Sequence, residues 1–218
     1  MTKIILNPKM KKILIIAANP PATSQLRLEQ EIRDVEEAIR RSRFREQFKV
    51  EIRVAARPID IRRALLDIEP QIVHFCGHGE GQSGLVLEDV TGLPKLVSSE
   101  ALSSLFQLFA NSVECVLLNA CYSEVQADAI VQHINYVIGM NQEIRDDAAI
   151  AFAVGFYDTL GAGRSVEFAY ELGCVAIQTA IDQNTTGDRK LIPVDVVGES
   201  RTIEEHLKPV LKRKRLDL

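Results

Sequence analysis

Short apolar runs alternate with amphipathic segments along this chain, and the alternation predicts the elements of its fold. Apolar runs typical of strands buried on both faces lie at residues 13–18, 72–76, 113–118 and 136–140. Residues 50–55 instead alternate apolar and charged side chains, as an edge-side strand does. Because amphipathic helices separate these strands, the pattern predicts an α/β fold with a mostly parallel central sheet.

The helices are predicted from apolar residues that recur every three or four positions. The first long helix carries Leu28, Ile32, Val35 and Ile39 on one face, the second Ile61, Ala64, Leu65 and Ile68, and the third Leu102, Leu105, Phe106 and Phe109. Ser98 or Ser99 is expected to cap the third helix. Residues 85–87 and 95–97 predict a small hairpin, which either borders a substrate cleft or is an ordinary surface hairpin.

The domain organisation follows from the length of 218 residues, 46% of them apolar, which is enough for one substantial core. We expect a leader at residues 1–10, one domain at 11–198 and a C-terminal basic helix or tail at 199–218. Pro193 makes residues 190–197 an edge strand, and Ile203, Leu207, Val210 and Leu211 have helical spacing. The basic cluster at 212–215 is interpreted as a solvated helix end.

Composition excludes several classes of function. A net charge of −4 leaves no electrostatic footprint for nucleic acid. The chain starts without a signal-peptide core, and its longest apolar run, residues 148–157, is about half of the ~20 residues that a membrane span needs, so a cytoplasmic protein is expected. The four cysteines have no CxxC or metal-ligand spacing, so no metal, cofactor or disulfide is expected, and Cys76, Cys115 and Cys174 are interpreted as reduced packing residues.

Cys121 lies where a buried strand gives way to small and polar residues that begin a helix. Ser123 and Gln126 fit a capping box for that helix. Free N–H groups and the positive end of the helix dipole would there favour thiolate over thiol, which makes a cysteine nucleophilic. The alternative is that Cys121 is simply a small buried residue.

His78 lies at the end of the preceding apolar strand, between Gly77 and Gly79. Neighbouring parallel strands end on the same edge of a sheet, so His78 and Cys121 are expected to meet there. The glycines leave the backbone bare, as suits a substrate or an oxyanion. A cysteine and a histidine that are distant in sequence and near in space form the pattern of a cysteine protease. His74, on the same side of the strand but deeper, is interpreted as a core histidine.

The segments Phe75-Cys76-Gly77-His78-Gly79-Glu80 and Leu117-Leu118-Asn119-Ala120-Cys121-Tyr122-Ser123 resemble the His and Cys motifs of CHAT domains. CHAT domains are a caspase-like peptidase family related to caspases and separases. Residues 12–20 and 26–33 also resemble the start of bacterial members, and the likeness runs from about residue 11 to about residue 180. The resemblance implies a three-layer α/β/α caspase-like fold and a cysteine endopeptidase that cleaves a protein substrate.

The resemblance also implies the roles of individual residues. Cys121 would be the nucleophile, His78 would transfer protons, and the backbone N–H groups of Cys121 and Gly79 would hold the oxyanion. No third catalytic side chain is identified, and a backbone carbonyl could orient the imidazole.

Substrate-pocket candidates are Asn119, Asp146 and Asp147. In relatives of this family, an acidic residue near the cleft can select a basic substrate residue, which the two aspartates could do. Acidic residues also simply favour a helix N-terminus, which is the simpler interpretation of both. Asn119 stands where basic-specific relatives carry an acid, and this departure counts against basic specificity.

Two other functions are compatible with parts of the sequence. A catalytically silent caspase-like scaffold would bind proteins and fail to react with thiol-directed peptide probes at Cys121. A flavodoxin-like or Toll/interleukin-receptor-like nucleotide module would need a glycine-rich first loop, and residues 19–22 contain no glycine. The family resemblance includes bacterial defence and cell-death systems, so a regulatory partner protein or ligand is expected for an active protease.

Overall fold

The fold is built on one twisted sheet with helices on both faces, and a computed structural model describes it for residues 10–182 and 204–215. The central sheet has the strand order β2-β1-β3-β6-β7-β8, and its neighbours are parallel except for β8, which runs antiparallel to β7. These six strands are β1 (Lys11–Ala18), β2 (Phe48–Arg53), β3 (Ile72–Gly79), β6 (Cys115–Asn119), β7 (Tyr136–Met140) and β8 (Pro209–Arg213).

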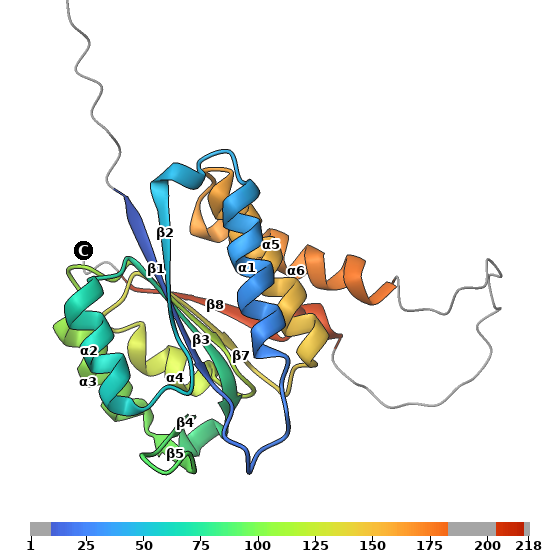
Figure 1. Cartoon of the computed structure of the whole chain (residues 1–218). Helices are drawn as coiled ribbons and strands as arrows, with labels where there is room; N and C mark the ends of the chain where they lie inside the picture. The colour runs from blue at the N-terminus through green and yellow to red at the C-terminus, as the bar shows by residue number, and fades with distance from the viewer. Residues whose placement is uncertain (1–9, 183–203, 216–218) are drawn as a thin grey trace, which may run out of the picture.

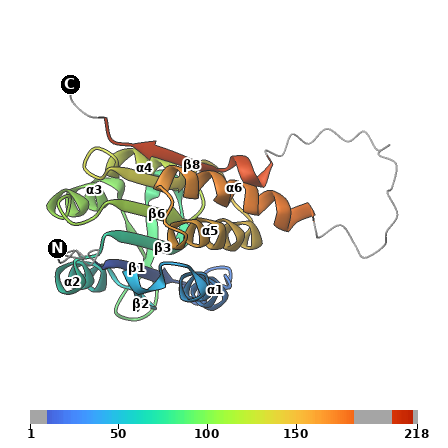
Figure 2. The same ribbon diagram turned by 90° about the horizontal axis from the view of Figure 1, so that it is seen from above.

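In the described residues, six α-helices cover the two faces of the sheet (Figure 1). They are α1 (Leu28–Arg41), α2 (Pro58–Ile68), α3 (Ser99–Leu108), α4 (Glu124–Ile130), α5 (Asp146–Gly161) and α6 (Val166–Asp182). Seen from above, α1, α5 and α6 lie on one side of the sheet and α2, α3 and α4 on the other (Figure 2). The expected α/β fold with a mostly parallel central sheet is therefore confirmed.

The core consists of two apolar layers, one on each face of the sheet. Leu117 packs into the layer under α1 and α5, and Leu118 packs into the layer under α2, α3 and α4. This alternation explains why the central strands read as continuous apolar runs, since successive side chains enter opposite layers. The predicted apolar stripes of the first two helices are buried as expected.

A small hairpin forms beside the C-terminal end of β3. Its strands β4 (Leu85–Glu88) and β5 (Pro94–Val97) are antiparallel, and β4 pairs with β3 through His78 and Val86. The predicted hairpin is confirmed, and this pairing makes it an extension of the strand that carries His78. Ser98 caps α3 by accepting a hydrogen bond from the Ala101 N–H, as expected.

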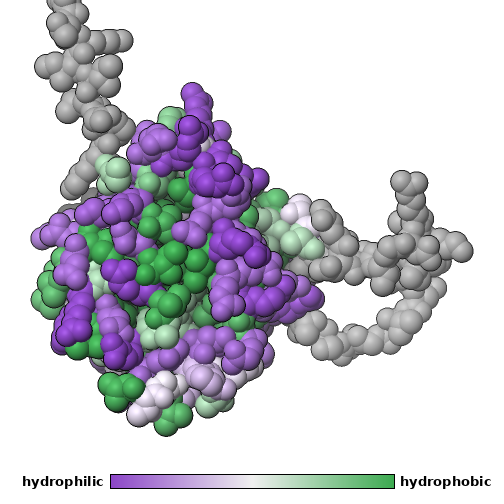
Figure 3. All heavy atoms as spheres, viewed as in Figure 1, coloured by the Kyte–Doolittle hydropathy of each residue, from purple (hydrophilic) through white to green (hydrophobic). Residues whose placement is uncertain are grey.

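The edges of the sheet differ from the sequence prediction. The edge strand β2 begins at Phe48 and ends at Arg53, so Val54, an apolar residue of the strand predicted at 50–55, lies outside the strand and is 66% exposed. Apolar side chains are visible over this edge, between the polar surfaces of α1 and α2 (Figure 3). The strand predicted at residues 190–197 and leader residues 1–9 lie outside the described residues.

The predicted C-terminal helix is wrong, because residues 209–213 form strand β8 on the edge of the sheet. Lys212 holds this strand against α4 through ion pairs with Glu124 (2.7 Å) and Asp128 (2.9 Å). The Tyr170 hydroxyl of α6 donates a hydrogen bond to the Pro209 carbonyl. Part of the basic tail is thus integral to the sheet. Among the helices of the described residues, none has the length and apolar character to cross a membrane.

Candidate active site

His78 and Cys121 lie on one cleft, at the edge where β3 and β6 end. The cleft has a volume of about 730 Å³, and its walls include Ser24, Glu80 and Tyr122. Because β3 and β6 are adjacent and parallel, the two motifs leave the sheet side by side. The two residues expected to meet at this edge therefore share one cleft.

The backbones of the two motifs are in direct contact at Gly79. A Cβ atom placed on Gly79 would lie 2.1 Å from the carbonyl oxygen of Cys121, far inside the contact distance of two such atoms. Only glycine lets the two chains approach this closely. Tyr122, the next residue after Cys121, adopts a left-handed φ of 54°. This conformation costs a non-glycine residue roughly 1–2 kcal/mol and makes a sharp turn directly after the thiol.

The imidazole of His78 is held by the loop that follows β1. His78 Nε2 lies 2.9 Å from the Ser24 carbonyl oxygen and 3.3 Å from Asn19 Oδ1. In the tautomer that carries its proton on Nε2, the ring donates to these oxygens and keeps the lone pair of Nδ1. Sequence reasoning allowed for a carbonyl in this role without locating it, since a backbone carbonyl has no sequence signature.

The thiol of Cys121 is half-buried and donates a long hydrogen bond to the Ile144 carbonyl, with Sγ and O 3.9 Å apart. Burial raises the pKa of the Cys121 thiol, and a hydrogen bond with the backbone of Ile144 opposes this only in part. The direction is opposite to the predicted shift toward thiolate. Since α4 begins only at Glu124, its first turn does not compensate for the loss of solvent around the sulfur.

The predicted capping box at Ser123 and Gln126 is wrong, because Ser123 makes no side-chain cap. The buried Ser123 hydroxyl donates to the Leu118 carbonyl (2.8 Å) and accepts from the Met140 N–H (2.9 Å), which ties the ends of β6 and β7 together.

Gln126 has a different role from capping. Its amide donates to the Gly81 carbonyl (2.7 Å) and to the Ser99 hydroxyl (2.9 Å). Gly81 belongs to the loop after His78 and lines the cleft. Gln126 therefore joins this loop to α3 and α4.

The pocket candidates separate into three environments. Asn119 is 4% exposed, and its amide donates to Glu31 Oε1 (2.5 Å) and to the Ala149 carbonyl (3.0 Å), so its side chain lies in the core instead of the cleft. Asp146 does line the cleft, where it forms an ion pair with Arg27 (2.7 Å). Asp147 pairs with Arg145 (2.6 Å) and accepts a hydrogen bond from the Ala148 N–H in the first turn of α5.

Sequence reasoning missed two further acids of the cleft, Glu80 and Glu143. Both are exposed, and neither has an ion-pair partner among the residues that the structure describes. Glu80 ends the His motif at residues 75–80, and Glu143 belongs to the loop before α5. Arg145 is the cleft residue of opposite charge, and Asp147 neutralises it.

Comparisons with known proteins agree with this geometry. The family model described as "CHAT domain" matches residues 6–171. The chain is 23% identical over 170 residues to a probable protease from Gillisia limnaea, covering 77% of this chain and 30% of that protein. It is also 23% identical over 175 residues to a Roc-COR-CHAT protease from an unknown prokaryotic organism, covering 77% of this chain and 16% of that protein. The chain thus spans less than a third of these relatives.

A solved structure resembles the fold. It is a secreted C11 cysteine protease from Bacteroides thetaiotaomicron in complex with an irreversible peptide inhibitor. The TM-score is 0.57 with 14% sequence identity, and the match covers 75% of this chain and 57% of that one. At this identity, the likeness establishes a shared fold.

Proposed function

Since the chain belongs to the CHAT domain family, we propose that it is a caspase-like cysteine endopeptidase in which Cys121 and His78 form the catalytic dyad. The observation that carries this proposal is the single cleft that both side chains line, at the ends of two adjacent parallel strands. The backbone contact between Gly79 and Cys121 supports the proposal, because this contact holds the His motif against the Cys motif.

Acylation begins when the sulfur of Cys121 attacks the carbonyl carbon of a bound peptide. The thiol proton moves to His78 Nδ1, which is free in the tautomer that donates from Nε2 to Ser24. The Ser24 carbonyl then favours the resulting imidazolium, because it accepts a hydrogen bond from a donor that has become charged. This proton transfer also overcomes the raised pKa of the buried thiol.

The oxyanion that forms is held by the backbone N–H groups of Gly79 and Cys121. Within the described residues, the Cys121 N–H donates to no backbone or side-chain acceptor, so it is available for this role. The left-handed turn at Tyr122 follows immediately after this N–H.

Collapse of the intermediate breaks the C–N bond, and His78 gives its proton to the leaving amine. Water then attacks the thioester while His78 accepts one of its protons. The C–S bond breaks, the acid product leaves, and Cys121 returns to its thiol form with the proton held by His78. Each step uses only groups that border the cleft.

The acids of the cleft favour a substrate with a basic side chain near the scissile bond. Glu80, Glu143 and Asp146 line the cleft, and Asp146 is already paired with Arg27. This leaves Glu80 and Glu143 as the acids available to a lysine or arginine of the substrate. Asp147, paired with Arg145 in the first turn of α5, acts as a helix N-terminal acid.

Activity is proposed to depend on a partner protein or ligand, in a bacterial defence or cell-death setting that the family resemblance suggests. Two features of the site support such regulation. The Cys121 thiol donates to the Ile144 carbonyl, and no hydrogen bond joins His78 to Cys121 in the described residues. A partner that moves the loop before α5 would free the thiol.

A proteomic cleavage profile tests the proposal. Cell lysate is incubated with wild type, Cys121→Ala, His78→Ala and the control Cys174→Ala, a cysteine of α6 outside the cleft. Wild type and Cys174→Ala are expected to generate new peptide termini that both dyad variants lose. Glu143→Gln is expected to reduce the share of cuts beside Lys or Arg. If wild type, Cys121→Ala, His78→Ala and Cys174→Ala give identical profiles, also after candidate partners are added, the catalytically silent scaffold is favoured.

A further inference from the structure

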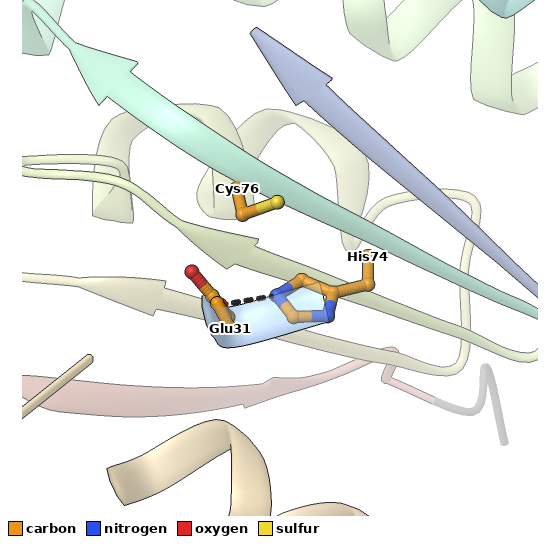
Figure 4. Close-up of side chains that lie close together, drawn as sticks. All are labelled: Glu31, His74 and Cys76. Atoms are coloured by element: carbon orange, nitrogen blue, oxygen red, sulfur yellow. Dashed lines mark ion pairs between the residues drawn. The ribbon is translucent and has the colours of Figure 1, made fainter. Parts of the chain in front are cut away.

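A second cluster of reactive side chains lies in the core, in the layer between the sheet and α1. Glu31 of α1 and His74 and Cys76 of β3 are 3%, 0% and 0% exposed. One donor atom from each lies within 4.8 Å of the other two. Figure 4 shows Glu31 facing the His74 ring, with the Cys76 thiol beside them. The proposed catalytic steps use none of the three.

The polar atoms of this cluster are incompletely satisfied. His74 Nε2 lies 3.1 Å from Glu31 Oε1, yet neither ring nitrogen makes a hydrogen bond in the described part of the chain. The buried Oδ1 atom of Asn119 also lacks a partner there, although its amide nitrogen donates to Glu31. Each buried polar group left unpaired costs about 1–3 kcal/mol. A cation would bind the lone pair of one His74 ring nitrogen and, beside it, the Glu31 carboxylate.

The positions of the three residues suit metal coordination. His74 and Cys76 are two apart on one strand, so their side chains project from the same face of β3. Glu31 reaches the same face from α1, between Leu28 and Val35 on its buried stripe. An imidazole nitrogen, a thiolate sulfur and a carboxylate oxygen are the three donor types that zinc accepts in proteins.

We propose that Glu31, His74 and Cys76 bind one divalent transition-metal ion, with zinc as the best match. On binding, the Cys76 thiol gives up its proton to solvent, and its weak bond to the Ile16 carbonyl (Sγ to O 3.7 Å) is replaced by a bond to the metal. The ion's two positive charges then balance one thiolate and one carboxylate, which leaves a neutral site in the core.

This site would be structural. It links α1 to the strand that carries His78, two residues beyond Cys76. Glu31 also accepts the hydrogen bond of Asn119, which lies two residues before Cys121. Sequence spacing could not reveal it, because one ligand comes from a distant helix and the other two are neither a CxxC pair nor a helical His pair.

Metal content tests the proposal without any activity measurement. Protein is expressed in zinc-supplemented medium, purified without chelators and measured by mass spectrometry of the elements. Wild type is expected to contain about one zinc ion per chain, as a closed structural site does. Cys76→Ser and His74→Gln are expected to contain little or none. Cys115→Ser is the matched control, since Cys115 is equally buried on the adjacent strand and outside the cluster.

A second experiment uses only the wild-type protein, so its result does not depend on whether the variants fold. It is unfolded in guanidinium with a chelator, then refolded with Zn²⁺, with Co²⁺ or with neither. Zn²⁺ is expected to raise its melting temperature, and Co²⁺ to give a thiolate charge-transfer band. No bound zinc after purification and refolding, together with no such band, would overturn the proposal and leave a buried Glu31–His74 ion pair.

Discussion

Gly79 is the residue at which the geometry of the candidate site is most tightly constrained. A Cβ atom there would lie 2.1 Å from the Cys121 carbonyl oxygen, so Gly79→Ala must push the two motifs apart. Moving a catalytic group by about 1 Å can reduce the rate by up to about 100-fold. We expect kcat/KM to fall by that order, with about 1–3 kcal/mol lost from the free energy of unfolding.

Gly92→Ala is the control for Gly79→Ala. Gly92 has a φ of 82° with nothing within 4 Å of an added Cβ, so alanine there adds backbone strain of roughly 1–2 kcal/mol and no collision. It should lose stability and keep full activity. Comparable losses of kcat/KM in both variants would contradict the role given to the Gly79 contact.

The pH dependence of Cys121 reactivity follows from the direction of its pKa shift. Burial raises the pKa of the thiol, so its thiolate fraction is small at neutral pH and increases as the pH rises. The alkylation rate with iodoacetamide should therefore rise about tenfold per pH unit from pH 7 to 8.5. Mass spectrometry of the Cys121 peptide measures it, with Cys174, whose pKa burial raises to about 11, as internal reference. A rate already constant near pH 7 would indicate a lowered pKa.

The sequence identified side chains of the candidate site better than its backbone contacts. His78 and Cys121 were found because each ends an apolar strand in a short polar motif. Asn119 was assigned to a pocket from its motif position, although strand alternation puts it on the same face as Leu117, toward α1 and α5. The Ser24 and Ile144 carbonyls had no signature, because every residue carries one.

Among the elements, α4 positions the loop after His78 through Gln126. Gln126→Leu keeps the volume and removes the donors to the Gly81 carbonyl and the Ser99 hydroxyl. We expect a loss of about 1–3 kcal/mol in denaturant unfolding and a higher KM, since the released loop lines the cleft. Gln132→Leu is the control, because Gln132 is exposed and bonds only within its own segment. Equal effects of both substitutions would count against this link.

The strands that were predicted correctly are those whose own residues show a clear burial pattern. Strands β1, β3, β6 and β7 are buried on both faces and read as unbroken apolar runs. Strand β8 was mistaken for a helix, because Leu207, Val210 and Leu211 fit helical spacing while its pairing with β7 depends on distant residues. Glu31, an acid within the apolar stripe of α1, is the sequence signal of a buried polar partner.

At the scale of the whole molecule, β8 closes the sheet beyond β7. Deleting residues 204–218 removes its pairing with β7, so the free energy of unfolding should fall by roughly 3–5 kcal/mol, at about 1 kcal/mol per ladder hydrogen bond. Thermal unfolding followed by circular dichroism measures the loss. Arg215→Ala, an exposed position beyond the strand, should change little. An unchanged melting temperature in the deletion would mean that β8 is dispensable.

The architecture places chemistry at one edge of the sheet and support behind it. Cys121 and His78 occupy the cleft, while Glu31, His74 and Asn119 fill the layer beneath α1 and α5. Strands β3 and β6, which lead to the proposed dyad, thus also carry His74 and Asn119, and α1 carries Glu31. A change in that layer is expected to reach the cleft through β3 and β6.

The measurement that tests the central claim most directly is labelling of the folded protein with a thiol-directed peptide probe, read by intact and peptide mass spectrometry. We predict one adduct per chain, on Cys121, that is lost in His78→Ala and in guanidinium, while Cys174→Ala labels as wild type does. Labelling at Cys121 that is absent, or no faster than in guanidinium, both for folded wild type alone and after candidate partners are added, would contradict the account and leave a caspase-like scaffold without catalysis.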